Sequence, residues 1–214
     1  MVHLIRNTVF PSNTYLLTIE GSGSCIIIDP GLNFEEIDNK IRELDLVPGY
    51  VLSTHAHFDH AGTAAFFQDK YKSKFCIHQA DLKLLKALNF YLKMVKLEMI
   101  VKTPKPDIVF SNYMSMDIAG SEIQVFNYPG HTDGSCIFLT KEGLFTGDLL
   151  YLNGIGTNPF PGQNDKKLQS SLTDILMRFD ENLMIYPGHG RYGQLKEFKL
   201  NNPELSKFLS FDFE

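Results

Sequence analysis

Cysteine is scarce in this sequence, and its spacing excludes a disulfide framework. Only three cysteines, Cys25, Cys76 and Cys136, occur in 214 residues, and no two of them form a Cys-x-x-Cys pair. An odd number of widely spaced cysteines in apolar runs such as "SCIII" is typical of buried thiols in a reducing compartment. We therefore expect three reduced, buried thiols and a cytoplasmic protein.

Long apolar runs are also missing. A helix that spans a membrane needs about 18 or more consecutive apolar residues, and no window of the sequence approaches that length. The start, "MVHLIRNTVFPSN", has no charged region leading into an apolar block, so it does not resemble a signal peptide. We expect no membrane association.

An excess of positive charge is the third absence. Lysine and arginine number 20 against 25 aspartate and glutamate residues, which gives a formal net charge of −5. Because phosphate binding usually leaves a basic footprint, we expect no nucleic-acid partner. With 43% hydrophobic and 21% charged residues, the composition is that of a soluble globular protein. The length suits one domain over residues 1–214, and the oligomeric state is not readable.

Apolar runs of strand type alternate with helical spacing along most of the chain. Strands are expected at residues 3–10, 13–21, 24–29, 50–54, 74–78, 121–128, 135–140, 143–148 and 182–188, and helices at 33–46, 60–71, 165–179 and 194–202. Asn33 is the expected N-cap of the first helix, and Pro48-Gly49 its end. This alternation predicts an α/β domain with one sheet packed on another and helices outside.

The segment 80–105 combines leucines at helical spacing with six lysines. It predicts one or two amphipathic helices closed by Pro104 and Pro106. The lysines suit either a solvated helical face, which is the simpler interpretation, or a lid that attracts anions.

The most informative stretch is "STHAHFDHAG", which follows a predicted strand. In an extended chain His55 and His57 point to the same side, and a turn at Phe58-Asp59 would bring Asp59 and His60 to a neighbouring point. A buried histidine without a partner costs free energy, so three together suggest a shared metal ion. Two divalent ions, with zinc favoured, suit this mixture of imidazole and carboxylate, and iron and manganese accept it too.

Three further motifs each place a metal-binding side chain after an apolar run and a glycine. "YPGHTDG" offers His131, "FTGDLL" offers Asp148 and "YPGHG" offers His189. Loops at strand ends, with small residues that let the backbone approach an ion, are where such sites are usually built. These motifs and the stretch "STHAHFDHAG" together contain five of the seven histidines. Each histidine alone could instead be structural, held by a local hydrogen bond, and we expect His3 and His78 not to be ligands.

Taken in order, "THAHFDHAG", "PGHTDGS", "TGD" and "YPGHG" resemble the motifs of the metallo-β-lactamase superfamily, and the resemblance extends over nearly the whole chain, including "IIIDPG". It implies a four-layer αββα sandwich with a site at one edge of the two sheets. The ligands that it implies are His55, His57 and His131 for one metal ion and Asp59, His60 and His189 for a second, with Asp148 bridging both.

Within this superfamily, "GDLLYLNGIGTNPFPG" and "YPGHGRYGQLKEFKLNNPEL" resemble the short, single-domain glyoxalase II-like hydrolases. The sequence departs from that group at Thr157 and Asn158, where an Arg and an Asp are common, and at Arg191-Tyr192-Gly193, where a Thr is common. It ends at Glu214 without the C-terminal helical domain that grips glutathione in longer glyoxalase II enzymes. The expected partner is a small-molecule substrate whose identity these motifs leave open.

The implied metal pair points to hydrolysis. Two ions about 3.5–4 Å apart can lower the pKa of a shared water toward neutrality. The predicted reaction is attack of this bridging hydroxide on a thioester or a related ester or lactone, with Asp59 as the catalytic residue that orients it and accepts its proton. A thiolate leaves with a pKa near 8.5, so it needs no strong general acid. Tyr151 could donate to an oxyanion, although a packed aromatic is the simpler interpretation.

Other functions fit parts of the same pattern. A mononuclear-iron oxidoreductase, similar to the persulfide dioxygenases of the superfamily, would use only some of the ligands, and the complete set favours hydrolysis. A metal-dependent phosphodiesterase would also use two metals, but the acidic charge balance weighs against it. A non-enzymatic binding protein on this scaffold should lack at least one ligand, and none is missing.

Overall fold

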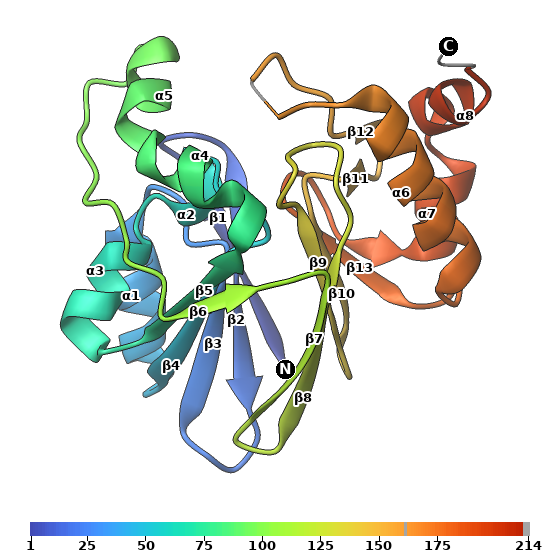
Figure 1. The fold of residues 1–214 in the computed structure, drawn as a ribbon. Helices are drawn as coiled ribbons and strands as arrows, with labels where there is room; N and C mark the ends of the chain where they lie inside the picture. The colour runs from blue at the N-terminus through green and yellow to red at the C-terminus, as the bar shows by residue number, and fades with distance from the viewer. Residues whose placement is uncertain (161, 212–214) are drawn as a thin grey trace.

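The computed structural model describes residues 1–160 and 162–211, and Figure 1 shows two sheets with helices on their outer sides. The strand orders are β1-β2-β3-β4-β5-β6 in the first sheet and β14-β13-β10-β9-β8-β7 in the second. The first sheet consists of β1 (Val2–Asn7), β2 (Ser12–Ile19), β3 (Ser24–Ile28), β4 (Val47–Leu52), β5 (Lys74–His78) and β6 (Ile108–Phe110). The second consists of β7 (Tyr113–Ile118), β8 (Ser121–Asn127), β9 (Cys136–Thr140), β10 (Gly143–Gly147), β13 (Met184–Pro187) and β14 (Gly193–Gln194).

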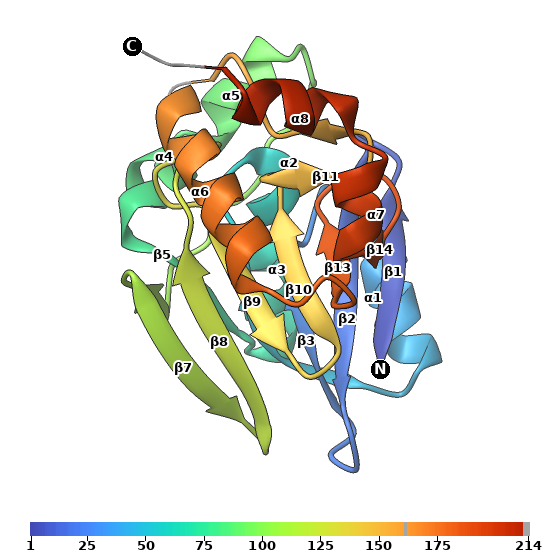
Figure 2. The same cartoon turned by 90° about the vertical axis from the view of Figure 1, so that its right-hand side faces the viewer.

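The helices form the two outer layers. The first half of the chain supplies α1 (Phe34–Glu43), α2 (Phe58–Ala61), α3 (Ala64–Tyr71), the 3-10 turn η1 (Gln79–Asp81), α4 (Leu82–Lys86) and α5 (Leu88–Met94). The second half supplies the ribbon of β11 (Leu150–Tyr151) and β12 (Gly154–Ile155), followed by α6 (Asp165–Arg178), α7 (Leu195–Leu200) and α8 (Pro203–Leu209). Figure 2 shows α6 and α7 over the outer face of the second sheet, with α8 above them. The expected αββα sandwich is confirmed.

The period-two alternation of β3 shows how the sequence builds these layers. Ile26 and Ile28 pack between the two sheets with Val125 of β8, whereas Cys25 and Ile27 face the opposite way, into the cluster beneath α1 and α3. Successive side chains of a strand point to opposite faces, so a run that is apolar at every position belongs to a sheet covered on both sides. Residues 25–28 of this strand are therefore buried on both faces of the sheet.

Asn33 occupies the N-cap position of α1, as expected. Its side chain makes no cap hydrogen bond, because Oδ1 accepts the backbone N–H groups of Thr8 and Val9 at 3.0 and 3.1 Å. Two expectations for this part of the chain were wrong. Pro48-Gly49 lies inside β4, at a register shift between β3 and β4, because the bulge accommodates the extra residue. The helix expected over 60–71 is two helices, α2 and α3, because Thr63 between them departs from helical geometry, with φ −106° and ψ 11°.

Other expectations are confirmed. The segment 80–105 contains two short helices, α4 and α5, and Lys83, Lys86 and Lys93 are exposed, as on a solvated helical face. The expected helix end at Pro104 and Pro106 was wrong, because α5 already ends at Met94. All three cysteines are buried and free. Among the described residues, no helix is long and apolar enough to span a membrane.

The loops that carry most of the predicted metal ligands lie at one edge of the sandwich because of the direction of their strands. β3 and β4 are parallel neighbours in the first sheet, and β10 and β13 are parallel neighbours in the second. Parallel strands end at the same edge of their sheet, so the loops that follow them come together. Asp29, the 53–57 loop, Asp148 and His189 each follow one of these four strands.

Candidate metal centre

The first group of candidate ligands brings together three imidazoles from two loops. His55 and His57 lie between β4 and α2, and His131 lies between β8 and β9. His55 Nε2 and His131 Nε2 each lie 3.0 Å from His57 Nδ1. All three side chains are buried, and with Asp148 they form a group whose potential ligand atoms lie within 4.8 Å of one another.

Hydrogen bonds on the far sides of two rings leave lone pairs facing His57. His131 Nδ1 donates to the carbonyl oxygen of Gly156 at 2.6 Å. His55 Nδ1 lies 3.1 Å from Thr54 Oγ1, and because this hydroxyl donates to a carboxylate, its oxygen accepts from the ring. Neutral His55 and His131 then carry no proton on Nε2. Burial lowers the pKa of both rings, and it lowers the pKa of His57 to about 3.

His55 Nε2 and His131 Nε2 both face His57 Nδ1, which can carry only one proton, so at least one of the two lone pairs has no hydrogen to accept. His57 Nε2 is itself buried and has no hydrogen-bond partner among the described residues, so its ring gains nothing from the opposite side. Neutral imidazoles whose lone pairs face one another are costly unless a cation lies between them. Three imidazole nitrogens suit a borderline divalent ion such as zinc or iron, so the residues present fit a metal ion.

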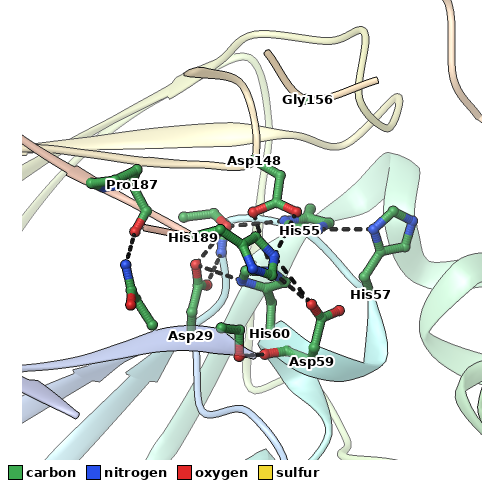
Figure 3. Close-up of polar contacts among 12 residues, drawn as sticks. Asp29, His55, His57, Asp59, His60, Asp148, Gly156, Pro187 and His189 are labelled. Carbon is green, nitrogen blue, oxygen red and sulfur yellow. Dashed lines mark hydrogen bonds and ion pairs between the residues drawn. The ribbon is translucent and has the colours of Figure 1, made fainter. Parts of the chain in front are cut away.

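The second group combines two imidazoles and two carboxylates, and Figure 3 shows them pointing toward one another. Asp59 and His60 belong to α2, His189 follows β13 and Asp148 follows β10. Asp59 Oδ2 lies 3.3 Å from His60 Nε2 and 3.3 Å from His189 Nε2. These side chains form a second group whose potential ligand atoms lie within 4.8 Å of one another.

Asp148 joins the two groups. Its Oδ1 lies 3.2 Å from His60 Nε2, and its Oδ2 lies 3.2 Å from His189 Nε2 and 3.6 Å from His131 Nε2. Two glycines make room for it, because a Cβ at Gly156 would overlap the Asp148 carbonyl oxygen and one at Gly188 would overlap Oδ1. One carboxylate is thus placed to contact an ion in either group.

The carboxylates dominate the electrostatics of the second group. Burial by itself lowers the pKa of His189, but the charge of Asp148 and its hydrogen bond raise it to about 10. The same carboxylate and Asp59 raise the pKa of His60 well above its ordinary value, again against the effect of burial. Burial alone would raise the pKa of Asp59, but the charge of His60 and hydrogen bonds from His189 and His60 hold it below its ordinary value. The site therefore attracts positive charge, which protons or a divalent ion can supply.

Asp29 supports both groups, and the sequence analysis gave it no role. Its Oδ1 accepts the Thr54 backbone N–H at 2.7 Å, and its Oδ2 accepts the Thr54 hydroxyl at 2.8 Å. Oδ2 also lies 3.1 Å from His60 Nδ1, which fixes that ring with Nε2 toward Asp59 and Asp148. A carboxylate directly after the apolar run of "IIIDPG" was the available signal.

Asn13 is a second residue that sequence reasoning missed. Its Nδ2 donates to the carbonyl oxygens of Pro187 and Gly190 at 2.9 and 3.0 Å, which bracket His189. Tyr15 Oη donates to the same Pro187 oxygen at 2.6 Å. Nothing in "PSNTY" indicated this contact, because its partners lie more than 170 residues away.

Aromatic rings line the approach to the centre. The Phe160 ring lies 5.4 Å from that of His57 and 5.4 Å from that of Tyr91, between centroids. Tyr151 packs edge-on against His189 at 5.6 Å, which confirms it as a packed aromatic. Burial and then the Asp148 carboxylate raise the pKa of Tyr151 well above its ordinary value, so its hydroxyl keeps its proton.

The structure thus brings all seven predicted ligands into one centre, at the edge where four strands end. His3 and His78 lie outside both groups. His78 Nδ1 accepts the backbone N–H of Ala80 at 3.2 Å, the kind of local hydrogen bond expected of a structural histidine.

Comparison with known proteins finds similarity over nearly the whole chain, a range that includes the positions of all seven candidate ligands. A model of the metallo-beta-lactamase superfamily matches residues 7–189. Hydroxyacylglutathione hydrolase GloC of Haemophilus influenzae is 30% identical over 209 residues, which cover 96% of this chain and 98% of that protein.

Two solved structures are also similar. BLEG-1 B3 metallo-beta-lactamase has a TM-score of 0.87 and 27% identity, with 99% of this chain and 100% of that chain covered. TTHA1623, solved in a di-iron-bound form, has a TM-score of 0.83 and 28% identity, with 94% and 99% covered.

Proposed function

The chain belongs to the metallo-beta-lactamase superfamily, and from this premise we propose that it is a dinuclear-metal hydrolase that cleaves a thioester or a related ester or lactone. The observation that carries the proposal is the position of Asp148, which belongs to both groups of candidate ligands. Two cations that share a carboxylate are held close together, which is the arrangement that two-metal hydrolases use.

The seven side chains described above would hold the two ions, and zinc and iron both suit their nitrogen and oxygen atoms. Bound there, the ions would polarise a substrate carbonyl and lower the pKa of a water molecule between them. Asp59 is ionised in this environment, since hydrogen bonds and the nearby imidazole hold its pKa low. We propose that its carboxylate orients the attacking water and accepts the proton that the water gives up.

The residues around the centre suit a leaving group that departs without being protonated by a general acid. Tyr151 has a strongly raised pKa and faces Asp148, so it is a poor general acid. A thiolate with a pKa near 8.5 leaves without protonation, whereas an amine does not. This favours a thioester over an amide.

The wall of the site suits an apolar acyl group. Phe160 is half-buried between His57 and Tyr91. Its backbone N–H is held by Asn158 Oδ1 at 2.7 Å, and Asn158 Nδ2 in turn donates to the His131 carbonyl oxygen at 3.1 Å. The ring is thus fixed relative to the first group, where it can pack against the acyl part of a small-molecule substrate.

The test is a substrate panel with the purified protein loaded with zinc, iron or manganese. A hydroxyacyl-glutathione thioester comes first, because the GloC relative carries the name of such a hydrolase. Other thioesters, lactones and phosphodiesters follow, with oxygen uptake measured on a persulfide. Thioester or ester hydrolysis that needs metal supports the proposal. Oxygen uptake with one iron per chain, or cleavage of phosphodiesters alone, would overturn it.

A further inference from the structure

Asp81 is a buried carboxylate to which the reaction above gives no role. It lies at the junction of η1 and α4 and is 2% exposed. Its Oδ2 accepts the backbone N–H of Ala56 at 2.9 Å and the hydroxyl of Thr132 at 2.9 Å. Its Oδ1 accepts the backbone N–H of Gly134 at 2.8 Å. Both oxygens therefore have donors, although burial raises the pKa of the group.

The partners of Asp81 are neighbours of the candidate ligands. Ala56 is the residue between His55 and His57, and Thr132 directly follows His131. One carboxylate thus joins two loops that are more than 70 residues apart in the sequence and that together supply the three imidazoles of the first group. A second hydrogen bond, from the Thr132 backbone N–H to Ser135 Oγ at 3.0 Å, stiffens the second loop where Asp81 holds it.

We propose that Asp81 is a positioning residue that holds the His55, His57 and His131 rings in register and thereby sets the affinity of the first group for a divalent cation. The inference rests on the metal centre of the proposed function. Outer residues that orient metal-binding side chains typically change metal affinity by about 10- to 100-fold when they are replaced. Asp81 acts on the residues next to the ligands, through two backbone N–H groups and the Thr132 hydroxyl, rather than on the ring nitrogens, so it affects all three rings together.

An asparagine cannot replace this carboxylate without a mismatch. The three hydrogen bonds need an acceptor on both sides of the carboxyl group, and an amide offers only one. In one orientation its NH2 faces the Gly134 N–H, and in the other it faces the Ala56 N–H. Asp81→Asn therefore keeps the size of the side chain and forces apart one of the two loops.

Gly134 gives an independent way to disturb the same contact. A Cβ at this position would lie 2.5 Å from Asp81 Cγ and 2.6 Å from its Oδ1. Gly134→Ala must therefore displace the carboxylate while leaving its charge in place. Asp81→Asn removes the charge and Gly134→Ala keeps it. If both variants weaken metal binding, the position of the carboxylate is the cause.

Asp38 supplies a matched control. It is 5% exposed and its carboxylate also has three partners, since it accepts from Lys70 Nζ at 2.6 Å and Tyr71 Oη at 2.7 Å and pairs with Arg42 Nε at 3.1 Å. It belongs to α1, outside both groups of candidate ligands. Asp38→Asn removes the charge of a buried carboxylate that also has three partners, without touching the loops that carry the histidines.

The experiment measures zinc binding to each protein by competition with a chromophoric chelator, and thermal unfolding of the metal-free forms. Asp81→Asn and Gly134→Ala should bind one zinc ion as the unchanged protein does and the other about 10- to 100-fold more weakly, with activity restored by excess zinc. Asp38→Asn should lose stability but bind both ions normally. If Asp81→Asn does not fold, Gly134→Ala alone decides.

Two results would overturn the inference, and they are distinguishable. If the unchanged protein binds two zinc ions and both variants bind them equally well, Asp81 has only a structural role and the proposed function stands. If the unchanged protein binds no metal at all, the proposed function and the role of Asp81 fall together.

Discussion

His57 Nδ1 lies 3.0 Å from His131 Nε2, although 74 positions separate the two residues in the sequence. The far nitrogen of the His131 ring donates to the Gly156 carbonyl oxygen, so the contact brings a lone pair against a second imidazole. A neutral His57 can donate its Nδ1 proton to only one of the two lone pairs that face it, since His55 Nε2 also lies 3.0 Å away, and burial lowers the pKa of His57 and His131. A divalent cation between the rings removes the cost of the lone pair that is left, and the predictions about metal binding depend on that conclusion.

The first prediction concerns pH and the metal-free protein. Asp148 raises the pKa of His189 to about 10, whereas an unfolded histidine has a pKa near 6.5. A raised pKa contributes stability that is complete below about 6.5 and is lost as the pH rises toward about 10. The free energy of unfolding of the metal-free protein should therefore fall between pH 7 and 8.5, by up to about 1.4 kcal/mol per pH unit for one such proton.

Urea unfolding at a series of pH values measures this slope. His189→Gln should reduce it, and the zinc-loaded protein should not show it, because a metal-bound imidazole has already lost its proton. A stability that rises with pH over this range would contradict the assigned electrostatics.

Asp59→Asn should lower kcat for the best substrate by about 100-fold or more, because the variant cannot accept the proton of the attacking water. Asp133→Asn is the control, since its carboxylate is exposed, pairs with Lys167 at 2.7 Å and lies two residues from His131. That variant should retain nearly full activity. Steady-state kinetics and metal content measured on the same samples separate lost chemistry from lost metal, and undiminished turnover by Asp59→Asn would exclude the role given to it.

The three thiols should be unreactive in the folded protein. Burial raises the pKa of Cys25 and of Cys76 to about 12, and it raises the pKa of Cys136 further. Since the thiolate is the reactive form, alkylation by iodoacetamide at pH 8 should be roughly three orders of magnitude slower than for a free thiol. Mass spectrometry should find three modified cysteines only after unfolding, and rapid modification of the native protein would show that these side chains are accessible.

Asn202 should matter more for stability than its neighbour. Its Nδ2 donates to the carbonyl oxygens of Tyr151 and Gly154 at 2.9 and 2.8 Å, and its Oδ1 caps α8 through the Leu205 N–H at 2.9 Å. Asn202→Ala should lower the free energy of unfolding by about 2–3 kcal/mol. Asn201→Ala, at an exposed position, should change it by less than about 0.5 kcal/mol. Equal effects in denaturant unfolding would mean that the ribbon of β11 and β12 does not depend on this contact.

The sequence predicts the centre well because its ligands are marked locally. Each of the motifs around His55, His131, Asp148 and His189 combines a ligand type with an apolar run and a glycine, and the strand ends then bring them together. The glycines have a physical reason that the structure makes explicit, since a side chain at Gly188 would occupy the place of the Asp148 carboxylate. Each of these patterns can be recognised in the sequence without knowing which strand ends lie next to one another in the fold.

The residues that support the centre are less readable, because their partners are distant in sequence. Asn13 contacts the loop of His189, and Asp81 joins the loops of His57 and His131. A lone asparagine or aspartate in a polar stretch has many possible uses, and only the tertiary structure selects one. Asn33 shows the same limit, since its position suggests a helix cap but its side chain holds the 8–9 turn instead.

The number of zinc ions that the metal-free protein binds tests the paired metal centre most directly, measured by competition titration for the unchanged chain, His131→Ala and His189→Ala. We expect two tightly bound ions for the unchanged chain and one for each variant, since each substitution removes a ligand from a different group. Absence of tight binding by the unchanged chain, or two ions still bound tightly by both variants, would contradict the paired metal centre.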